Sequence, residues 1–374
     1  MKSMKQTDCA PEMETREVRT SLAAAITLGL EKGRFASGVR LNGLNLVLNY
    51  EDGCHASCAY CGLSKERRAG SNTSPEAGCG SGEKDSTTFI RVKWPSYSLA
   101  DILPRAAAAE GKIKRVCVGM LTHQHCLEDA VEVIRAFRRE TALPISALVT
   151  ATLCRSRRDM EELRAAGADR MAVAVDAATP ELFDRHRGRA VRGPHRWGHY
   201  WQVLDWGVEV FGPRRAGCHL VVGLGETEEQ MVRAIQEVRD RGGVTHLFSF
   251  FPEEGSPLEN WPQPPLGQYR RVQLARYLID EGLSDWPKMR FNPAGQLVDF
   301  GCPTTEAVAI GKAFMTPGCP DEETGEVACN RPFGNERPSE PFRNFPYRPG
   351  LEEVAQIRGQ LEEGLEIGRE NLAL

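Results

Sequence analysis

The sequence of 374 residues has no apolar run near the length needed to cross a membrane. Its ends are polar, without the pattern of a secretory signal. The formal net charge is only −4, so the chain lacks the global basic field that nucleic-acid binding favours. These absences argue against a membrane span and against nucleic acid as a partner, and we expect a cytoplasmic protein.

Cysteine, by contrast, is abundant, with 12 in the chain. Without a secretory signal, such a number favours metal ligation in a reducing compartment over disulfides. Cys117 and Cys218 lie inside apolar runs, and we expect them to be core residues. Four others lie in or beside loops, at spacings that do not predict ligation: Cys9, Cys79, Cys126 and Cys154.

Three cysteines are grouped directly after an apolar, strand-like run. The run is Leu44–Tyr50, and Cys54, Cys58 and Cys61 follow it at a C-x3-C-x2-C spacing. This spacing brings three soft thiolates together at the carboxyl end of a strand, where α/β sheets and barrels bind their ligands. Three thiolates leave one metal position open, as an iron–sulfur cluster that holds a substrate requires. A zinc ion with a distant fourth ligand and simple core packing are the alternatives.

The motif Cys-Ala-Tyr-Cys-Gly resembles that of the radical S-adenosylmethionine (SAM) enzymes, which have an aromatic residue before the third cysteine. Tyr60 and Gly62 match the residues that usually flank it. The resemblance implies a [4Fe-4S] cluster on Cys54, Cys58 and Cys61, with SAM chelated to its unique iron. It also implies that reduction cleaves SAM to a 5′-deoxyadenosyl radical, which abstracts hydrogen from a substrate carbon.

Strand-like and helix-like segments alternate along the middle of the chain. Besides Leu44–Tyr50, the expected strands are Ile113–Met120, Pro144–Thr150, Asp169–Val175, Cys218–Gly223 and Thr245–Phe251. The expected helices are Leu127–Glu140, Asp159–Ala166, Trp197–Trp206 and Glu226–Arg241. This alternation predicts an α/β fold with a parallel sheet. Six units are too few for an eight-stranded barrel, so we predict a partial (β/α)6 barrel. The resembled family has the same core, with its cluster loop after the first strand. This agreement disfavours the zinc alternative.

We predict that this barrel spans residues 41–300. Residues 1–40 would form an amino-terminal extension with one amphipathic helix, Glu12–Glu31, and residues 301–374 a carboxyl-terminal extension ending in a helix. The loop Arg67–Thr88, rich in Gly, Ser and charge, is a candidate cover for the site.

Several predicted strand ends carry candidate cofactor-binding residues. Asp176 follows the fourth strand, where its carboxylate could accept the hydroxyls of a ribose or, alternatively, only the N–H groups of its own turn. In biotin-synthase-like members a carboxylate at this position binds the ribose. The stretch Gly-Leu-Gly-Glu-Thr after the fifth strand resembles one that supports the adenosine in that group, and it contributes Gly223, Gly225 and Glu226. The second strand end departs from the family pattern and offers Met120, His123 and Gln124.

A second group of cysteines lies downstream among prolines and glycines: Cys302, Cys319 and Cys329. Rigid turns of this kind present isolated ligands, so the three could hold an auxiliary iron–sulfur cluster, with Ser339 as a possible source of a fourth ligand. The alternative is three unrelated thiols. The irregular segment Asn330–Pro349 is expected to wrap over the barrel mouth.

Three stretches together resemble one component of the split, two-protein lipoyl synthase: Cys-Ala-Tyr-Cys-Gly-Leu-Ser, Phe-Phe-Pro-Glu-Glu-Gly-Ser-Pro-Leu and Asn-Arg-Pro-Phe-Gly-Asn-Glu-Arg-Pro. The resemblance implies sulfur insertion into an octanoyl chain on a lysine of a carrier protein. It also implies an electron donor such as ferredoxin or flavodoxin, and a second radical SAM protein. The alternatives are another radical SAM reaction, such as a rearrangement or methylation of a cofactor precursor, and a non-catalytic iron–sulfur scaffold or redox sensor.

Overall fold

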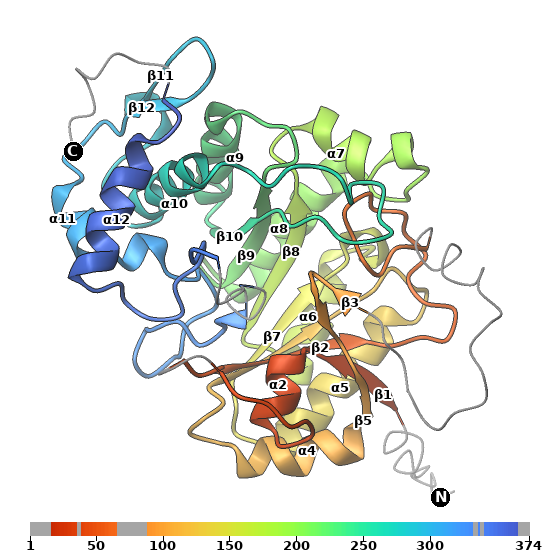
Figure 1. The fold of residues 1–374 in the computed structure, drawn as a ribbon. Coiled ribbons are helices and arrows are strands. Elements are labelled where there is room, and N and C mark those ends of the chain that lie inside the picture. Colours follow the sequence, from red (N-terminus) through yellow and green to blue (C-terminus); the bar gives the residue numbers. More distant parts are fainter. Residues whose placement is uncertain (1–15, 36–38, 66–87, 332–335, 337–339, 366–374) are drawn as a thin grey trace, which may run out of the picture.

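The computed structural model describes residues 16–35, 39–65, 88–331, 336 and 340–365. Within them, the central sheet has the strands β1 (Glu17–Thr20), β2 (Gly43–Leu48), β5 (Ser96–Ser98), β6 (Arg115–Gly119), β7 (Ile145–Val149), β8 (Arg170–Asp176), β9 (Ala216–Val222) and β10 (Val244–Ser249). Their order is β10-β9-β8-β7-β6-β2-β1-β5 (Figure 1). β2 and β6 through β10 pair in parallel, whereas β1 pairs antiparallel with both β2 and β5.

Helices alternate with the parallel strands along the chain: α4 (Leu99–Ala108), α5 (Cys126–Glu140), α6 (Arg157–Ala166), α7 (Pro180–His186), α8 (Trp197–Phe211), α9 (Glu228–Asp240) and α10 (Leu266–Asp280). Neighbouring helices pack on one another, α4 on α5, α5 on α6, α6 on α8 and α9 on α10. β5 and β10 form opposite edges of the sheet, so the barrel is not closed. The prediction of a partial α/β barrel with six parallel strands is confirmed.

Shorter elements surround this core: α2 (Leu22–Thr27), β3 (Thr88–Phe89), β4 (Val92–Lys93), β11 (Arg290–Phe291), β12 (Leu297–Asp299), α11 (Thr305–Ile310) and α12 (Leu351–Glu362). β3 and β4 form a hairpin, and α10 packs between β10 and α12. The amino-terminal strands and the helices α10 to α12 therefore lie at opposite edges of the sheet (Figure 1).

The expected helix Glu12–Glu31 is wrong over most of its described length. Glu17–Thr20 is strand β1, and only α2 is helical. Val18 pairs with Leu48 of β2, and its side chain is fully buried, so tertiary pairing outweighs the local helical pattern. The division of the chain near residues 40 and 300 stays a prediction.

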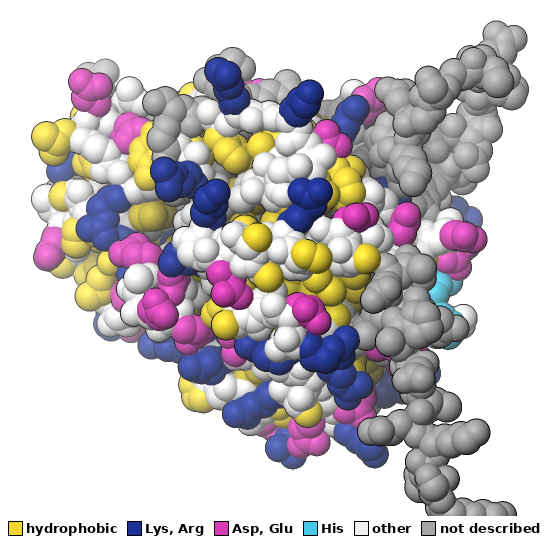
Figure 2. All heavy atoms as spheres, turned by 90° about the horizontal axis from the view of Figure 1, so that it is seen from below, with side chains coloured by type: hydrophobic (Ala, Val, Ile, Leu, Met, Phe, Trp, Pro, Cys, Tyr) yellow, Lys and Arg dark blue, Asp and Glu magenta, His cyan; other side chains and the backbone are white. Residues whose placement is uncertain are grey.

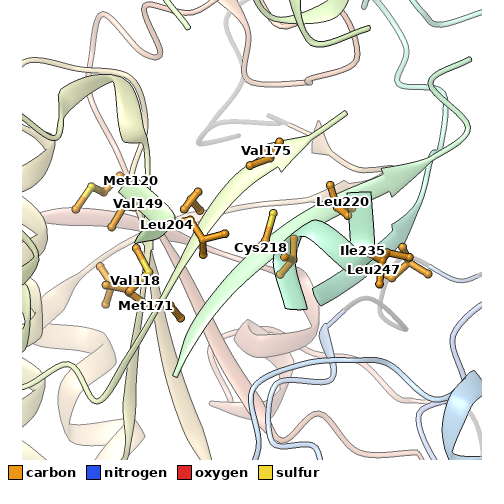
Figure 3. Packing of buried hydrophobic residues seen from close by; sticks show 14 of the residues in the cluster. Val118, Met120, Val149, Met171, Val175, Leu204, Cys218, Leu220, Ile235 and Leu247 are labelled. Atoms are coloured by element: carbon orange, nitrogen blue, oxygen red, sulfur yellow. The ribbon is translucent and has the colours of Figure 1, made fainter. Parts of the chain in front are cut away.

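The core lies between the sheet and the helix layer. Figure 3 shows Cys218 of β9 among hydrophobic side chains such as Leu204 of α8 and Val175 of β8. Cys218 is fully buried in this cluster, which confirms its expected role in the core. All six residues of β2 are buried as well, because the strand is covered on both faces. Strands of this kind are nearly continuous apolar runs in the sequence. Each buried Leu or Val side chain of β2 contributes about 1.5 to 3 kcal/mol to folding.

The surface agrees with the charge expected from the sequence. On the face seen in Figure 2, Lys and Arg are mixed with Asp and Glu without a continuous field of one sign. Among the described helices, none combines the length and the apolar character that a bilayer crossing demands.

Candidate active site

The loop that follows β2 carries the first cysteine group. Three backbone hydrogen bonds attach it to neighbouring segments: His55 N donates to Thr122 O at 2.8 Å, Ala59 N to His186 O at 2.8 Å, and Leu258 N to Ala59 O at 3.1 Å. Cys54 and Cys58 are buried and Cys61 is partly buried. The thiols of all three are free, and all three residues line one cavity. The structure thus brings the predicted cluster ligands together.

The spacing of these sulfurs fits a cluster better than a single ion. A tetrahedral zinc ion with 2.3 Å bonds would hold its sulfurs only about 3.8 Å apart. Within the described part of the chain, only Asp52, His55 and His123 bring three candidate ligand atoms within 4.8 Å of one another. Cys54, Cys58 and Cys61 are not such a group, so their sulfurs are not arranged around one ion.

Burial makes these thiols poor thiolates by themselves. It raises the pKa of Cys58 to about 11, against the opposing charge of Arg187, and it raises the pKa of Cys61 well above its usual value. A buried thiolate therefore needs a positive charge next to its sulfur atom, and the iron of a cluster supplies that charge. Soft sulfur donors and burial together fit an iron–sulfur cluster at Cys54, Cys58 and Cys61.

Asp176 lies beside this loop, at the end of β8, with a left-handed φ of +65°. A register shift between Ala174 and Asp176 disturbs the strand there. The hydroxyl of Tyr60 donates to Asp176 Oδ2 at 2.5 Å, and Arg187 Nη1 lies 2.9 Å from the same oxygen. Tyr60 and Asp176, both predicted as cofactor-binding residues, are thus joined, and both line the cavity. The alternative, that Asp176 only receives the N–H groups of its own turn, does not describe its contacts with Tyr60 and Arg187.

Arg187 is a charged residue of the cavity wall that the sequence reasoning missed. Its guanidinium is buried, donates to the carbonyls of Ala174 and Val175, and lies 4.9 Å from the ring centroid of Tyr200. Burial acts against its charge, but Tyr60 and Asp176 raise the pKa of Arg187 well above its usual value. Arg187 follows α7 without any local motif, so only its proximity to Asp176 reveals it.

The glycine-rich turn after β9 supports the site from outside the cavity lining. Gly223 and Gly225 both have φ near +108°, a conformation that favours glycine. Glu226 accepts hydrogen bonds from Gly223 N at 2.7 Å and from Leu224 N at 2.9 Å. The carboxylate of Glu226 thus holds its own turn. Burial raises the pKa of Glu226 to about 7, although these N–H groups favour its ionised form.

The candidates at the end of β6 separate into two groups. Met120 lines the cavity, whereas the ring of His123 stacks on Tyr50 with centroids 3.7 Å apart and lies 3.3 Å from Asp52. Gln124 is hydrogen-bonded to His125 at 3.0 Å. His123 therefore fastens the cysteine loop, and only Met120 faces the cavity.

The cavity itself has a volume of about 250 Å³. Its walls between the cysteine loop and the deeper strand residues are largely apolar and include Leu46, Val47, Leu63, Phe89, Trp94, Leu121, Phe248 and Phe250. The β3–β4 hairpin contributes Phe89, and Glu253 holds this hairpin by accepting from Thr88 Oγ1 at 2.9 Å and from Arg91 N at 2.8 Å. The predicted cover, Arg67–Thr88, lies outside the described residues except for Thr88.

The second cysteine group is not assembled as the sequence suggested. Cys302 is partly buried, and the side chains that act on its thiol are Ser284, Asp299 and Lys288. The thiols of Cys319 and Cys329 instead interact electrostatically with each other and with the thiol of Cys117. Cys117 lines the cavity. Cys302 therefore does not share a site with the other two, and the expectation that Cys117 is only a core residue is wrong. Gly62 does not line the cavity, and Ser339 lies outside the described residues.

Comparisons with known proteins agree with this geometry. The model of the radical SAM superfamily matches residues 48–238. The chain is similar in fold to methylornithine synthase (PylB), at 14% identity over 69% of this chain and 67% of that one, with a TM-score of 0.45. It is also similar to HydG, a maturase of the [FeFe]-hydrogenase, at 12% identity over 69% of this chain and 53% of that one, with a TM-score of 0.46.

A third similar structure is coproporphyrinogen III oxidase (HemN) from Escherichia coli, at 15% identity over 56% of this chain and 47% of that one, with a TM-score of 0.36. The matches to HydG and HemN thus span about half of those proteins. Comparison with curated protein sequences gives no match.

Proposed function

This chain belongs to the radical SAM superfamily, and from that premise we propose that it inserts sulfur into an octanoyl chain carried on a lysine of a carrier protein, as one component of a two-protein lipoyl synthase. The observation that supports this proposal is the largely apolar cavity, which extends from the cysteine loop to the thiol of Cys117. An aliphatic chain is the substrate class that such walls favour.

The residues around the cavity each have a role in this reaction. Cys54, Cys58 and Cys61 would hold the [4Fe-4S] cluster. With SAM bound at the reduced cluster, the chemistry supplied there would be a 5′-deoxyadenosyl radical able to take hydrogen from a saturated carbon. Tyr60 and Arg187 orient the Asp176 carboxylate at the cavity wall, where its free oxygen is available to a ribose hydroxyl.

The apolar walls have two effects on the reaction. Phe248 and Phe250 exclude water from the reacting carbon, which protects a carbon radical from side reactions. Leu46 and Leu121 supply contact area for the methylene groups of the substrate. Because dispersion and hydrophobic contacts are non-directional, these walls bind the chain, and the geometry of the cysteine loop selects the carbon.

Sulfur would come from a second iron–sulfur cluster, which is consumed as a substrate. The carbon radical and a sulfide ion form the C–S bond, and the one electron left over reduces a ferric ion of that cluster. A ferredoxin or flavodoxin would supply the electron for SAM cleavage, and a second radical SAM protein would form the other C–S bond. We also propose a cytoplasmic location, where thiols remain reduced.

The test is anaerobic incubation of the reconstituted protein with reductant, SAM and an octanoyl-lysine peptide. We expect 5′-deoxyadenosine and a peptide that gains the mass of one sulfur atom. Cys58→Ala should abolish both products, while Cys154→Ala, a buried thiol outside the cavity lining, should retain both. Deoxyadenosine without sulfur on the peptide would reject lipoyl synthesis in favour of another radical SAM reaction. A protein that never forms deoxyadenosine would be a scaffold or sensor.

A further inference from the structure

The carboxyl-terminal segment 316–331 closes the amino-terminal end of the barrel. Arg115, the first residue of β6, donates to Pro320 O at 3.0 Å and to Glu322 at 2.9 Å. Asn42, just before β2, donates its N–H to Asn330 Oδ1 at 2.9 Å. The segment therefore lies under the strands, at the end opposite the loop of Cys54, Cys58 and Cys61, and brings its own cysteines there.

Close backbone packing determines where these cysteines lie. A Cβ atom on Gly43, the first residue of β2, would lie 2.9 Å from Cys329 Cα. Cys329 N donates to Cys319 O at 3.0 Å, so the two cysteines share one tight turn. His246 of β10 donates from Nδ1 to Pro317 O at 2.6 Å, and its Nε2 lies 3.9 Å from Cys319 Sγ. The turn is thus fastened to strands on both sides of the cavity.

Cys117 reaches the same place from inside the barrel. It pairs in register with Asn45 of β2, and Asn45 Nδ2 donates to Cys329 Sγ at 3.4 Å. Asn45 lies three residues before the end of β2, about 10 Å below the start of the cysteine loop at 3.3 Å per residue. Cys117 lines the cavity at this depth, and Cys319 and Cys329 lie beside it without lining the cavity, so the three form a second thiol set on the far side from Cys54, Cys58 and Cys61.

Two buried polar atoms beside this set have no hydrogen-bond partner among the described residues: Arg331 Nη1 and Asn45 Oδ1. Both residues line the cavity. The Arg331 guanidinium calls for an anionic ligand here, because leaving a buried cation unpaired costs several kcal/mol. A thiolate-bound iron–sulfur cluster carries such negative charge.

We propose that Cys117, Cys319 and Cys329 ligate a second iron–sulfur cluster at the closed end of the cavity, with Arg331 as its charge partner. The three thiols are not arranged as the ligands of one ion in the described part of the chain, and soft sulfur donors beside a buried cation suit an iron–sulfur cluster. Cys302 has no part in this site. The inference deepens the proposed function, since it places the sulfur source at the far end of the substrate cavity.

The test measures bound iron instead of activity. The triple variant Cys54→Ala/Cys58→Ala/Cys61→Ala removes the first cluster, and after anaerobic reconstitution it should retain about two to four irons per chain, depending on cluster type. Adding Cys117→Ala, Cys319→Ala or Cys329→Ala should remove nearly all of this iron. The Mössbauer signal of the remaining cluster should vanish with the iron.

Matched controls separate ligation from damage to the fold. Cys218→Ala removes a buried thiol from strand β9 of the same sheet, and Cys302→Ala removes the ligand that the sequence suggested. Both should leave the iron of the triple variant unchanged. Circular dichroism of the iron-free variants checks folding, and Cys117→Ser repeats the test with a smaller change in volume. Iron that survives Cys117→Ala, iron that is lost with Cys302→Ala, or a triple variant without iron would each overturn the inference. Failure of sulfur transfer with both clusters present would reject only the proposed function.

Discussion

At the scale of single residues, the contacts of Arg187 determine how the candidate cofactor site is held. Arg187 balances the buried carboxylate of Asp176 and is covered by the rings of Phe183 and Tyr200. Its charge and the carboxylate are each costly to bury alone but are tolerated as a pair. Burial raises the pKa of the Tyr60 phenol well above its usual value, so Tyr60 stays a hydrogen-bond donor to Asp176.

We predict that Arg187→Met destabilises the protein by about 3 to 5 kcal/mol, because the variant leaves the Asp176 carboxylate buried without its cation. Urea unfolding of the iron-free chain measures this loss. Arg189→Met is the control, since the side chain of Arg189 is 79% exposed and pairs with Asp184 at the surface. Its effect should stay within about 0.5 kcal/mol. Equal losses in the two variants would contradict the role given to Arg187.

His195 provides a prediction about pH. Burial and the nearby charge of Arg187 lower the pKa of His195 to about 2, so its imidazole is neutral in the folded protein. The unfolded chain binds a proton there below about pH 6.5, which favours unfolding. The stability that neutral His195 contributes is therefore present above pH 6.5 and is lost as the pH falls toward 2.

The slope of unfolding free energy against pH measures this effect. His195→Asn should reduce the slope between pH 6 and pH 4 by up to about 1.4 kcal/mol per pH unit, while His125→Asn, at an exposed position, should not change it. Parallel curves for the wild type and His195→Asn would show that His195 is not buried as a neutral group.

At the scale of elements, the same glycine-to-alanine change should have opposite effects in two carboxyl-terminal segments. In helix α12, Gly359 is exposed and an added Cβ meets no atom within 4 Å, so Gly359→Ala should stabilise the protein by about 0.5 to 1 kcal/mol. At Gly318, an added Cβ would lie 1.7 Å from Cys329 O. Gly318→Ala should therefore destabilise the closure of the barrel by about 1 to 3 kcal/mol.

Thermal unfolding of the two variants checks both signs. Gly318→Ala should also lower the iron retained by the triple variant of the first cysteine group, because it moves Cys319 and Cys329 apart, whereas Gly359→Ala should not. A Gly318→Ala protein as stable as the wild type would mean that the segment 316–331 does not pack against the barrel as the structure has it.

At the scale of the whole molecule, SAM binding should stabilise the fold only when the first cluster is present. A ligand that binds only the folded chain stabilises it by about 2.7 kcal/mol at 100 times its Kd. We expect an anaerobic thermal shift with SAM in the reconstituted wild type and in Cys154→Ala, and a much smaller one in Cys58→Ala or after iron is removed by a chelator. A full shift without iron would show that SAM binds independently of the cysteine loop.

Local sequence patterns were sufficient to predict the parallel strands, their helices and the group Cys54, Cys58 and Cys61. Strands buried on both faces are continuous apolar runs, and ligands grouped within eight residues on one loop stay together in any fold. Such features depend on neighbours in the chain, so the amino-acid order alone specifies them. Asp176 was found for the same reason, since it directly follows the apolar run of β8.

Contacts between distant segments were decided only by the folded chain. Strand pairing turned Glu17–Thr20 from an expected helix into β1, and burial beside Asp176 gave Arg187 a role that its local sequence does not show. The partner of Cys319 and Cys329 is Cys117, some 200 residues earlier, instead of the nearby Cys302. Sequence spacing cannot predict such partners. Which remote cysteines meet depends on which strand ends the carboxyl-terminal segment covers, and tertiary packing decides that.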